Sequence, residues 1–189
     1  MNIYDFDNTI FKGDSSIKFI KYSLLRHPFL VLVASLKSLG EVIKYIFKKS
    51  DFEKIKGKMF SFVKRINNLD EYLDKYVNSK MKYIKEFYYD NQKDTDVIIS
   101  ATCDFIIERF CKKLNIKYVI ATKYDIDKCV IIGLNCKGEE KVKRLNEVFK
   151  KYKVIEAYSD SKSDLPMLRL AEKPYMVKND KLIELKLNK

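Results

Sequence analysis

The sequence is poor in the residues that interrupt regular secondary structure. Its 189 residues include only five glycines and three prolines. These two residue types supply many of the tight turns between short strands, so their scarcity argues against an all-β protein and favours long regular elements. Hydrophobic residues make up 47% of the chain and charged residues 34%, a balance typical of a globular protein. The length suits one domain, or one domain with an inserted subdomain.

Patterns of metal-binding cysteine and histidine are also missing. The chain has four cysteines, none of them in a C-x-x-C pair, and His27 is its sole histidine. This composition excludes the usual Cys/His zinc sites, so no zinc is expected. We interpret the cysteines as thiols of a reducing compartment.

Two further absences concern the membrane. The first ten residues carry acids where a secretory signal would carry basic residues, so no signal peptide is expected. The most apolar run, FLVLVASL at 29–36, is too short to span a bilayer. We therefore expect a soluble cytoplasmic protein, and we leave peripheral contact with a membrane open.

Positive charge, by contrast, is abundant. The net charge is +12, and residues 14–93 hold 17 Lys and Arg against 9 Asp and Glu, a local charge of +8. A surface of this sign attracts phosphate esters, nucleic acids or anionic lipid headgroups. A general preference for lysine in the composition would produce the same excess, so charge alone does not identify a partner.

Residues 14–90 predict four helices. Asp14 or Ser15 is a suitable cap for the first, Pro28 suits the first turn of the second, and Asp51 caps the third. Four helices in this length would form a small bundle. We expect them at residues 17–26, 28–49, 52–66 and 70–88.

From residue 96 the pattern changes to alternating strands and helices. The runs DVIISAT, KYVIAT and KVIEAY indicate buried parallel strands, and KCVIIGLNCKG indicates a short hairpin or flap. The predicted fold class is α/β, a Rossmann-like doubly wound parallel sheet core (1–13 and 91–189) with an inserted four-helix cap (14–90). Amphipathic helices are expected at residues 104–114, 139–151 and 163–171.

Asp5 and Asp7 stand one residue apart in DFDNT, at the end of the first predicted strand. If the strand includes both, their side chains point to the same side. If the strand ends at Asp5, Asp7 lies in the following turn, and its side chain can still approach that of Asp5. Taken alone, the pair suits either an acidic turn that caps backbone groups or a nucleophile with an acid/base partner.

Other polar residues lie at the ends of core elements, where open α/β sheets bind ligands. Ser100 ends the next core strand, and Asp160 and Asp164 follow the last one in YSDSKSD. Lys141 lies at the start of the helix that precedes that last strand. Each residue alone also suits a structural role, as a strand-end hydroxyl, a helix cap, a surface acid or an exposed lysine.

As a set, these residues suit phosphoryl transfer. Asp5, Asp7 and Asp160 offer the oxygen ligands that Mg²⁺ prefers. Ser100 and Lys141 can bind phosphoryl oxygens and stabilise the charge of the transition state. Asp5 can attack phosphorus, and Asp7 can protonate the leaving oxygen and later deprotonate water.

The four clusters, DFDNT, a serine ending a hydrophobic strand, a lysine and SDSKSD, resemble the four motifs of the haloacid dehalogenase-like hydrolase superfamily in order and spacing. The helical insertion after the first motif and the phrase NCKGEEKVKRL look like its phosphoserine-phosphatase-like branch. This resemblance implies a Mg²⁺-dependent phosphatase that acts on a phosphomonoester through an aspartyl phosphate on Asp5.

The resemblance also implies a role for each matched residue. Asp5 would be the nucleophile and Asp7 the acid/base. Mg²⁺ would bind the Asp5 side chain, the Asp7 main-chain carbonyl and Asp160. Asp164 would be a further ligand, or an acceptor for Lys141 or for metal-bound water. Thr9 would also support the loop, and the residues expected to bind the substrate phosphate are Thr9, Ser100, Ala101 and Lys141.

The substrate stays open at this point. Ser100-Ala101-Thr102 departs from the paired glycines of phosphoserine phosphatases, and IKFIKYSLLRHPFLVLV looks like phosphatases of phospholipid headgroups. The phosphate could belong to a soluble metabolite, or to a lipid or polynucleotide end, with nucleic acid the least expected partner. A catalytically idle protein that binds anionic surfaces through the cap is the third alternative, which the intact set of acids and lysine disfavours.

Overall fold

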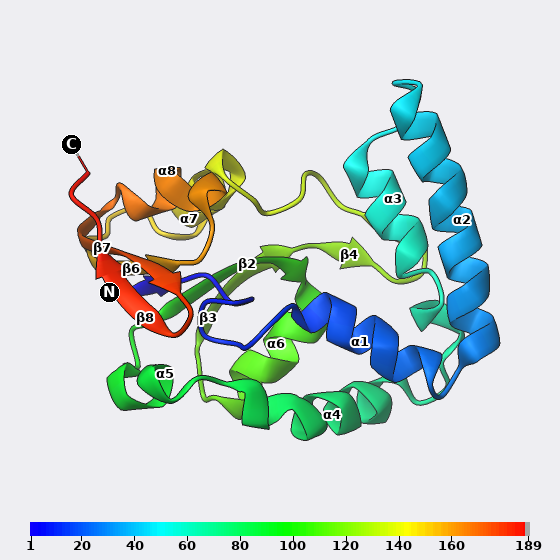
Figure 1. The fold of residues 1–189 in the computed structure, drawn as a ribbon, viewed down its shortest axis with the longest axis horizontal. Helices are drawn as coiled ribbons and strands as arrows, with labels where there is room; N and C mark the ends of the chain where they lie inside the picture. Colours follow the sequence, from blue (N-terminus) through cyan, green and yellow to red (C-terminus); the bar gives the residue numbers. More distant parts are fainter. Residues whose placement is uncertain (188–189) are drawn as a thin grey trace.

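The computed structural model describes residues 1–187, which form a six-stranded sheet with helices on both faces (Figure 1). The strand order is β3-β2-β1-β6-β7-β8, and only the β7–β8 pair is antiparallel. This arrangement confirms the predicted α/β fold class. The strands are β1 (Ile3–Tyr4), β2 (Val97–Cys103), β3 (Tyr118–Thr122), β6 (Val154–Ser159), β7 (Ala171–Lys178) and β8 (Lys181–Glu184).

Alternate residues of the central strands enter two different cores, as the period of two along a strand requires. Ile3 and Ile99 pack with residues of α7 (Glu139–Val148) and α8 (Leu165–Leu168). Tyr4 and Ile98 pack on the other face with residues of α6 (Asp104–Lys113). All four side chains are fully buried. Because both faces are covered, β1 and β2 are predominantly apolar.

Residues 14–91 contain five α-helices rather than four, because the last predicted helix is divided at η2 (Met81–Tyr83). Asp14 and Asp51 accept hydrogen bonds from backbone amides three residues later, as predicted for caps. The third helix ends earlier than predicted, and η1 (Val63–Arg65) follows it. The five helices are α1 (Ser15–Leu24), α2 (Pro28–Ile46), α3 (Phe52–Met59), α4 (Leu69–Lys80) and α5 (Glu86–Asn91).

The helical segment and the sheet share one aromatic core. Tyr76 of α4 packs against Phe19 of α1 and Phe110 of α6, with ring centroids 5.0 and 6.0 Å away. The hydrophobic cluster is therefore continuous from the predicted cap into the predicted core. The predicted boundaries between core and cap, at residues 13/14 and 90/91, stay predictions. The last two residues of the predicted core, 188 and 189, lie outside the described part of the chain.

The predicted flap is a hairpin of β4 (Tyr124–Asp125) and β5 (Val130–Ile131), which begins earlier than expected. It packs against α3 at Gly57, where an added Cβ would lie 3.0 Å from the Cys129 carbonyl oxygen. The Tyr124 hydroxyl also donates to the Gly57 carbonyl oxygen at 3.0 Å. Only a glycine allows α3 and the hairpin to approach this closely.

The C-terminal part differs most from the prediction. The helix expected at 163–171 is replaced by η3 (Lys162–Asp164) and the four-residue α8. β7 and β8 were not predicted, and the left-handed residues Asn179 and Asp180 form the turn between them. Within residues 1–187, no helix has the length and apolar character needed to cross a bilayer.

Candidate active site

The two N-terminal acids lie just beyond β1, which ends at Tyr4. The Asp5 amide still donates to the Tyr158 carbonyl oxygen of β6 at 2.9 Å, so Asp5 is held at the end of the sheet. Asn8 then adopts a left-handed conformation with φ of 57°, and its amide donates to the Gly13 carbonyl oxygen. The strand therefore does not continue through both acids, and Asp7 lies in the loop that follows.

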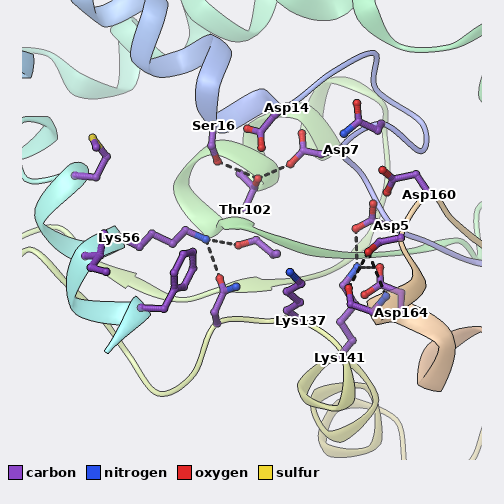
Figure 2. A pocket seen from close by; sticks show the side chains of 18 of the residues that line it. Asp5, Asp7, Asp14, Ser16, Lys56, Thr102, Lys137, Lys141, Asp160 and Asp164 are labelled. Atoms are coloured by element: carbon purple, nitrogen blue, oxygen red, sulfur yellow. Dashed lines mark hydrogen bonds and ion pairs between the residues drawn. The ribbon is translucent and has the colours of Figure 1, made fainter. Parts of the chain in front are cut away.

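Asp5 forms a buried ion pair with the lysine predicted from the sequence. The Lys141 Nζ lies 2.6 Å from Asp5 Oδ1 and 2.7 Å from Asp164 Oδ2. Burial alone would lower the pKa of Lys141, but the two carboxylates outweigh this effect and hold its pKa above the ordinary value. The lysine thus remains a fixed positive charge beside the proposed nucleophile (Figure 2).

Thr9 connects Asp5 to Asp160. Its hydroxyl donates to Asp5 Oδ2 at 3.0 Å and accepts from the Asp160 amide at 2.9 Å. Thr9 is fully buried and is absent from the residues that line the cavity. In this structure it therefore supports the acids, whereas the sequence also predicted a contact between Thr9 and the phosphate.

Asp160 and Asp164 come from the segment that follows β6. The Ser159 hydroxyl donates to Asp164 Oδ2 at 2.8 Å, while Asp164 Oδ1 is buried without a hydrogen-bond partner among the described residues. Burial and then the nearby Asp5 carboxylate raise the pKa of Asp160. Lys141 pairs with Asp5 and Asp164, and with Asp160 beside them the three carboxylates carry more negative charge than this lysine offsets, so a further cation would be stabilised here.

A divalent cation fits this donor set. Asp5, Asp160 and the unpartnered oxygen of Asp164 present hard oxygen ligands at the end of the sheet. Within residues 1–187, no group of three or more His, Cys, Asp or Glu side chains is positioned to hold a metal by itself. The site would therefore need the predicted main-chain carbonyl of Asp7, or water and substrate oxygens, to complete the coordination.

Asp7 is held by neutral donors rather than by a cation. Thr102 Oγ1 donates to Asp7 Oδ2 at 2.6 Å, and the Ser15 amide donates to Asp7 Oδ1 at 2.6 Å. Burial raises the pKa of Asp7 to about 7, although both hydrogen bonds oppose this change. A carboxyl group with this pKa can both give and take a proton near neutral pH.

Strand β2 does not end at Ser100, as the sequence had suggested, but continues to Cys103 with an irregular register. Ser100 is 1% exposed and does not line the cavity, and its hydroxyl accepts from the Thr102 amide at 3.1 Å. Ala101 and Thr102 do line the cavity. Ser100 thus supports the irregular end of β2, and the two residues after it line the cavity.

The acids lie in a cavity of about 600 Å³ between the sheet and the helical segment. Lys56 of α3 reaches across it, donating to the Ala101 carbonyl oxygen at 2.5 Å and to Asn135 Oδ1 at 2.8 Å (Figure 2). Lys137 also lines the cavity. The apolar part of the lining comes from α1 and α3 and comprises Ile20, Phe52, Ile55, Met59 and Phe60.

The two chain segments that lead into and out of the helices are tied together behind the acids. The Lys85 Nζ donates to the Asn8 carbonyl oxygen at 2.6 Å and lies 3.0 Å from Asp180 Oδ1. Backbone hydrogen bonds join Lys12 to Tyr83 and Lys85 to Ile10. The buried Lys85 therefore fixes the residue that follows Asp7.

Sequence reasoning found the acids and Lys141, but it missed several of their neighbours. Thr102 appeared only as a departure from a glycine pair, and Ser15 only as a helix cap. Lys56 and Lys85 were two lysines among many in the basic segment, and no local signal distinguishes them. Their roles depend on contacts between residues 45 and 77 positions apart.

One protein family and one curated protein match parts of this chain. The family model of the haloacid dehalogenase-like hydrolases matches residues 3–169. A histidinol-phosphatase of Neisseria meningitidis is 34% identical over 103 residues, which cover 48% of this chain and 46% of that protein. The chain thus matches about half the length of this curated relative.

Solved structures share the fold. A protein of unknown function from Bordetella pertussis aligns with a TM-score of 0.65 at 16% identity, covering 89% of this chain and 85% of its own. A probable phosphoserine phosphatase from Vibrio cholerae aligns with a TM-score of 0.55 at 13% identity, covering 90% of this chain and 54% of its own. At such identities the similarity establishes the architecture alone.

Proposed function

We propose that this chain, which belongs to the haloacid dehalogenase-like hydrolase family, is a Mg²⁺-dependent phosphatase that hydrolyses a phosphomonoester through an aspartyl phosphate on Asp5. The observation that carries the proposal is the placement of two acids with different partners in one cavity. Asp5 is paired with the buried Lys141, and Asp7, with a pKa of about 7, has only neutral donors. The name of the Neisseria relative supports the same class of reaction.

The first step transfers the phosphoryl group to Asp5. Lys141 and the backbone at Ala101 bind the phosphoryl oxygens, while Thr9 holds Asp5 and Ser100 holds the end of β2. An Asp5 oxygen forms a bond to phosphorus as the bond to the ester oxygen breaks. Asp7 delivers its proton to the departing alkoxide, which leaves as an alcohol.

The second step releases phosphate. Asp7, now a carboxylate, takes a proton from a water molecule, and the resulting hydroxide attacks the phosphorus of the aspartyl phosphate. The bond between phosphorus and the Asp5 oxygen breaks, which restores the carboxylate and frees inorganic phosphate. Thr102 and the Ser15 amide orient Asp7 during both transfers.

Mg²⁺ is proposed to bind the Asp5 side chain, the Asp7 main-chain carbonyl and Asp160, with Asp164 as a ligand or as an acceptor for bound water. Bound there, it would supply positive charge that offsets the repulsion between the acids and the incoming phosphate. The unpartnered Asp164 Oδ1 supports this assignment, as does the position of Asp160, whose Oδ1 lies 3.5 Å from the Thr9 hydroxyl that also donates to Asp5.

The substrate is proposed to be a small phosphomonoester with an apolar portion. Polar groups of the cavity cluster around the acids, while Ile55, Met59 and Phe60 line the part beneath the cap helices. The same apolar wall supports a second candidate, a phosphate on a lipid headgroup. A catalytically idle binding protein is disfavoured, because Asp5 keeps its contacts with Thr9 and Lys141 and Asp7 keeps its hydrogen bonds from Thr102 and Ser15.

A substrate panel with metal control tests the proposal. We expect hydrolysis of at least one of p-nitrophenyl phosphate, histidinol phosphate, phosphoserine, sugar phosphates or phosphatidylglycerophosphate in Mg²⁺, and its loss in chelator with recovery on adding Mg²⁺ back. Thr95→Val, a change in an exposed side chain outside the cavity lining, serves as the control. Unchanged activity in chelator, or none with any phosphoester and metal, would contradict the proposal.

A further inference from the structure

The longest helix has a second apolar face that no described part of the chain covers. Six large side chains of α2 follow one another at intervals of three and four residues, which places them along one side of the helix. Each is between 51% and 71% exposed. They are Phe29, Leu32, Leu36, Leu39, Ile43 and Ile46, and we call them the α2 stripe.

The stripe is not the face with which α2 joins the fold. Val31, Ala34 and Ser38 are buried on another side of the helix, which packs against α1 and α3. Figure 1 shows α2 at the edge of the molecule, with α3 between it and the sheet. Soluble proteins rarely leave a contiguous apolar surface of this length exposed without a partner.

The segment that carries the stripe is strongly basic. Residues 15–59 carry ten lysines and arginines against three acids. Lys37 lies on α2, and Lys48 and Lys49 come shortly after the end of this helix at Ile46. All three side chains are exposed, and none of them forms an ion pair within residues 1–187. A second copy of the chain would bring the same charge to the same face, so the charge favours an anionic partner over self-association.

We propose that α2 binds the surface of an anionic lipid bilayer, with the α2 stripe in the headgroup region and the surrounding lysines against acidic headgroups. An apolar face bordered by basic residues is the arrangement of helices that lie in a membrane interface. The helix lies on the bilayer and does not cross it.

This contact would place the active-site cavity close to the membrane. Ser38, on the inner side of α2, lines the cavity that contains Asp5 and Asp7. One helix therefore connects the bilayer surface to the site. The inference rests on the surface of α2 and goes beyond the proposed phosphatase chemistry.

Vesicle sedimentation with the full chain tests this inference. We expect at least about tenfold more protein on vesicles containing phosphatidylglycerol than on phosphatidylcholine alone, with binding reduced by salt because the Debye length is about 10 Å at 0.1 M. Leu36→Asp combined with Leu39→Asp should abolish binding. Val148→Asp, at a similarly exposed apolar position of α7, should not.

Three results would overturn the inference. They are no binding to anionic vesicles at low salt, as much binding to neutral vesicles as to anionic ones, and the same loss of binding in Val148→Asp as in the α2 double variant. A dimer in light scattering that Leu36→Asp dissociates, without vesicle binding, would identify the stripe as a self-interface. The Asp5→Asn variant should still bind vesicles, so failure of the phosphatase proposal and failure of this inference are distinguishable.

Discussion

Asp5 and Asp7 are separated by one residue, yet different parts of the molecule hold them. Asp5 contacts Thr9 and Lys141, both outside the helical segment. Asp7 contacts Thr102 of β2 and the amide of Ser15, the first residue of α1. The environment of the proposed nucleophile is thus built by residues outside the helical segment, whereas that of the proposed acid/base depends on the first residue of α1.

The two environments suit different chemical tasks, attack on phosphorus for Asp5 and proton transfer for Asp7. Burial raises the pKa of Asp5, but the Lys141 cation 2.6 Å away opposes this change and favours the carboxylate form that would attack phosphorus. Asp7 has no such partner, and its raised pKa of about 7 keeps a proton available. Two neighbouring carboxyl groups therefore acquire separate roles from their surroundings rather than from the sequence around them.

Substitution of the two acids should produce the largest effects and should distinguish them. Asp5→Asn should lower turnover about 10⁴-fold or more with every substrate, because an amide cannot accept the phosphoryl group. Asp7→Asn should cost about 10²–10⁴-fold with an alkyl phosphate. With p-nitrophenyl phosphate, whose leaving group needs no proton, formation of the phosphoenzyme should be much less affected.

Single-turnover kinetics with both substrates would measure this difference, with circular dichroism as a control for folding. Equal losses for Asp7→Asn in the phosphorylation of both substrates would contradict its role as the general acid. Near-normal rates in Asp5→Asn would remove the nucleophile assignment.

Thr102→Val should act mainly on Asp7, to which Thr102 Oγ1 makes its shortest hydrogen bond; the weaker contacts with the Ser15 and Ser16 hydroxyls are lost as well. The hydroxyl favours the Asp7 carboxylate, so its loss should raise the pKa of Asp7 further. Activity that needs the carboxylate as a base should then decline at a higher pH on the acidic side of the profile, with kcat about tenfold lower. A pH profile measured beside Thr95→Val, an exposed control, tests this. An unchanged acidic limb would count against the Thr102–Asp7 contact.

Lys85→Met should lower activity without removing any group from the cavity. It leaves the Asn8 carbonyl oxygen without its donor, which typically costs about 1–3 kcal/mol of stability. We expect kcat to fall severalfold with little change in KM, because the residue after Asp7 loses its support. Lys181→Met, at an exposed site, is the control. A change in KM alone would indicate that Lys85 acts on substrate binding instead.

The smallest effect should come from two helical glycines with opposite surroundings. A Cβ at Gly57 would meet the backbone of Cys129 and Val130, so Gly57→Ala should destabilise the protein by about 1–3 kcal/mol. Gly40→Ala in α2 meets nothing within 4 Å and should stabilise it by about 0.5–1 kcal/mol. Urea unfolding of both variants would show whether the contact between α3 and the hairpin is as close as described.

Much of the fold could be predicted because its signals are local. The caps at Asp14 and Asp51 and the proline at the start of α2 mark helix ends within a few residues. The apolar runs of β2, β3 and β6 follow from burial on both faces. β7 was missed because Pro174 and several charged residues interrupt its apolar pattern. It is a strand because it pairs with β6 in the sheet, and its own sequence does not indicate this.

The sequence by itself determined the chemistry that is available: the acids, one lysine and their order along the chain. Only the tertiary structure decided which hydroxyl meets Asp7, which lysine crosses the cavity and which face of α2 remains exposed. Those outcomes depend on contacts such as Thr102 with Asp7, 95 residues apart, and Lys141 with Asp5, 136 residues apart. A local pattern specifies the elements, but distances between side chains arise only when the sheet and the cap helices pack together.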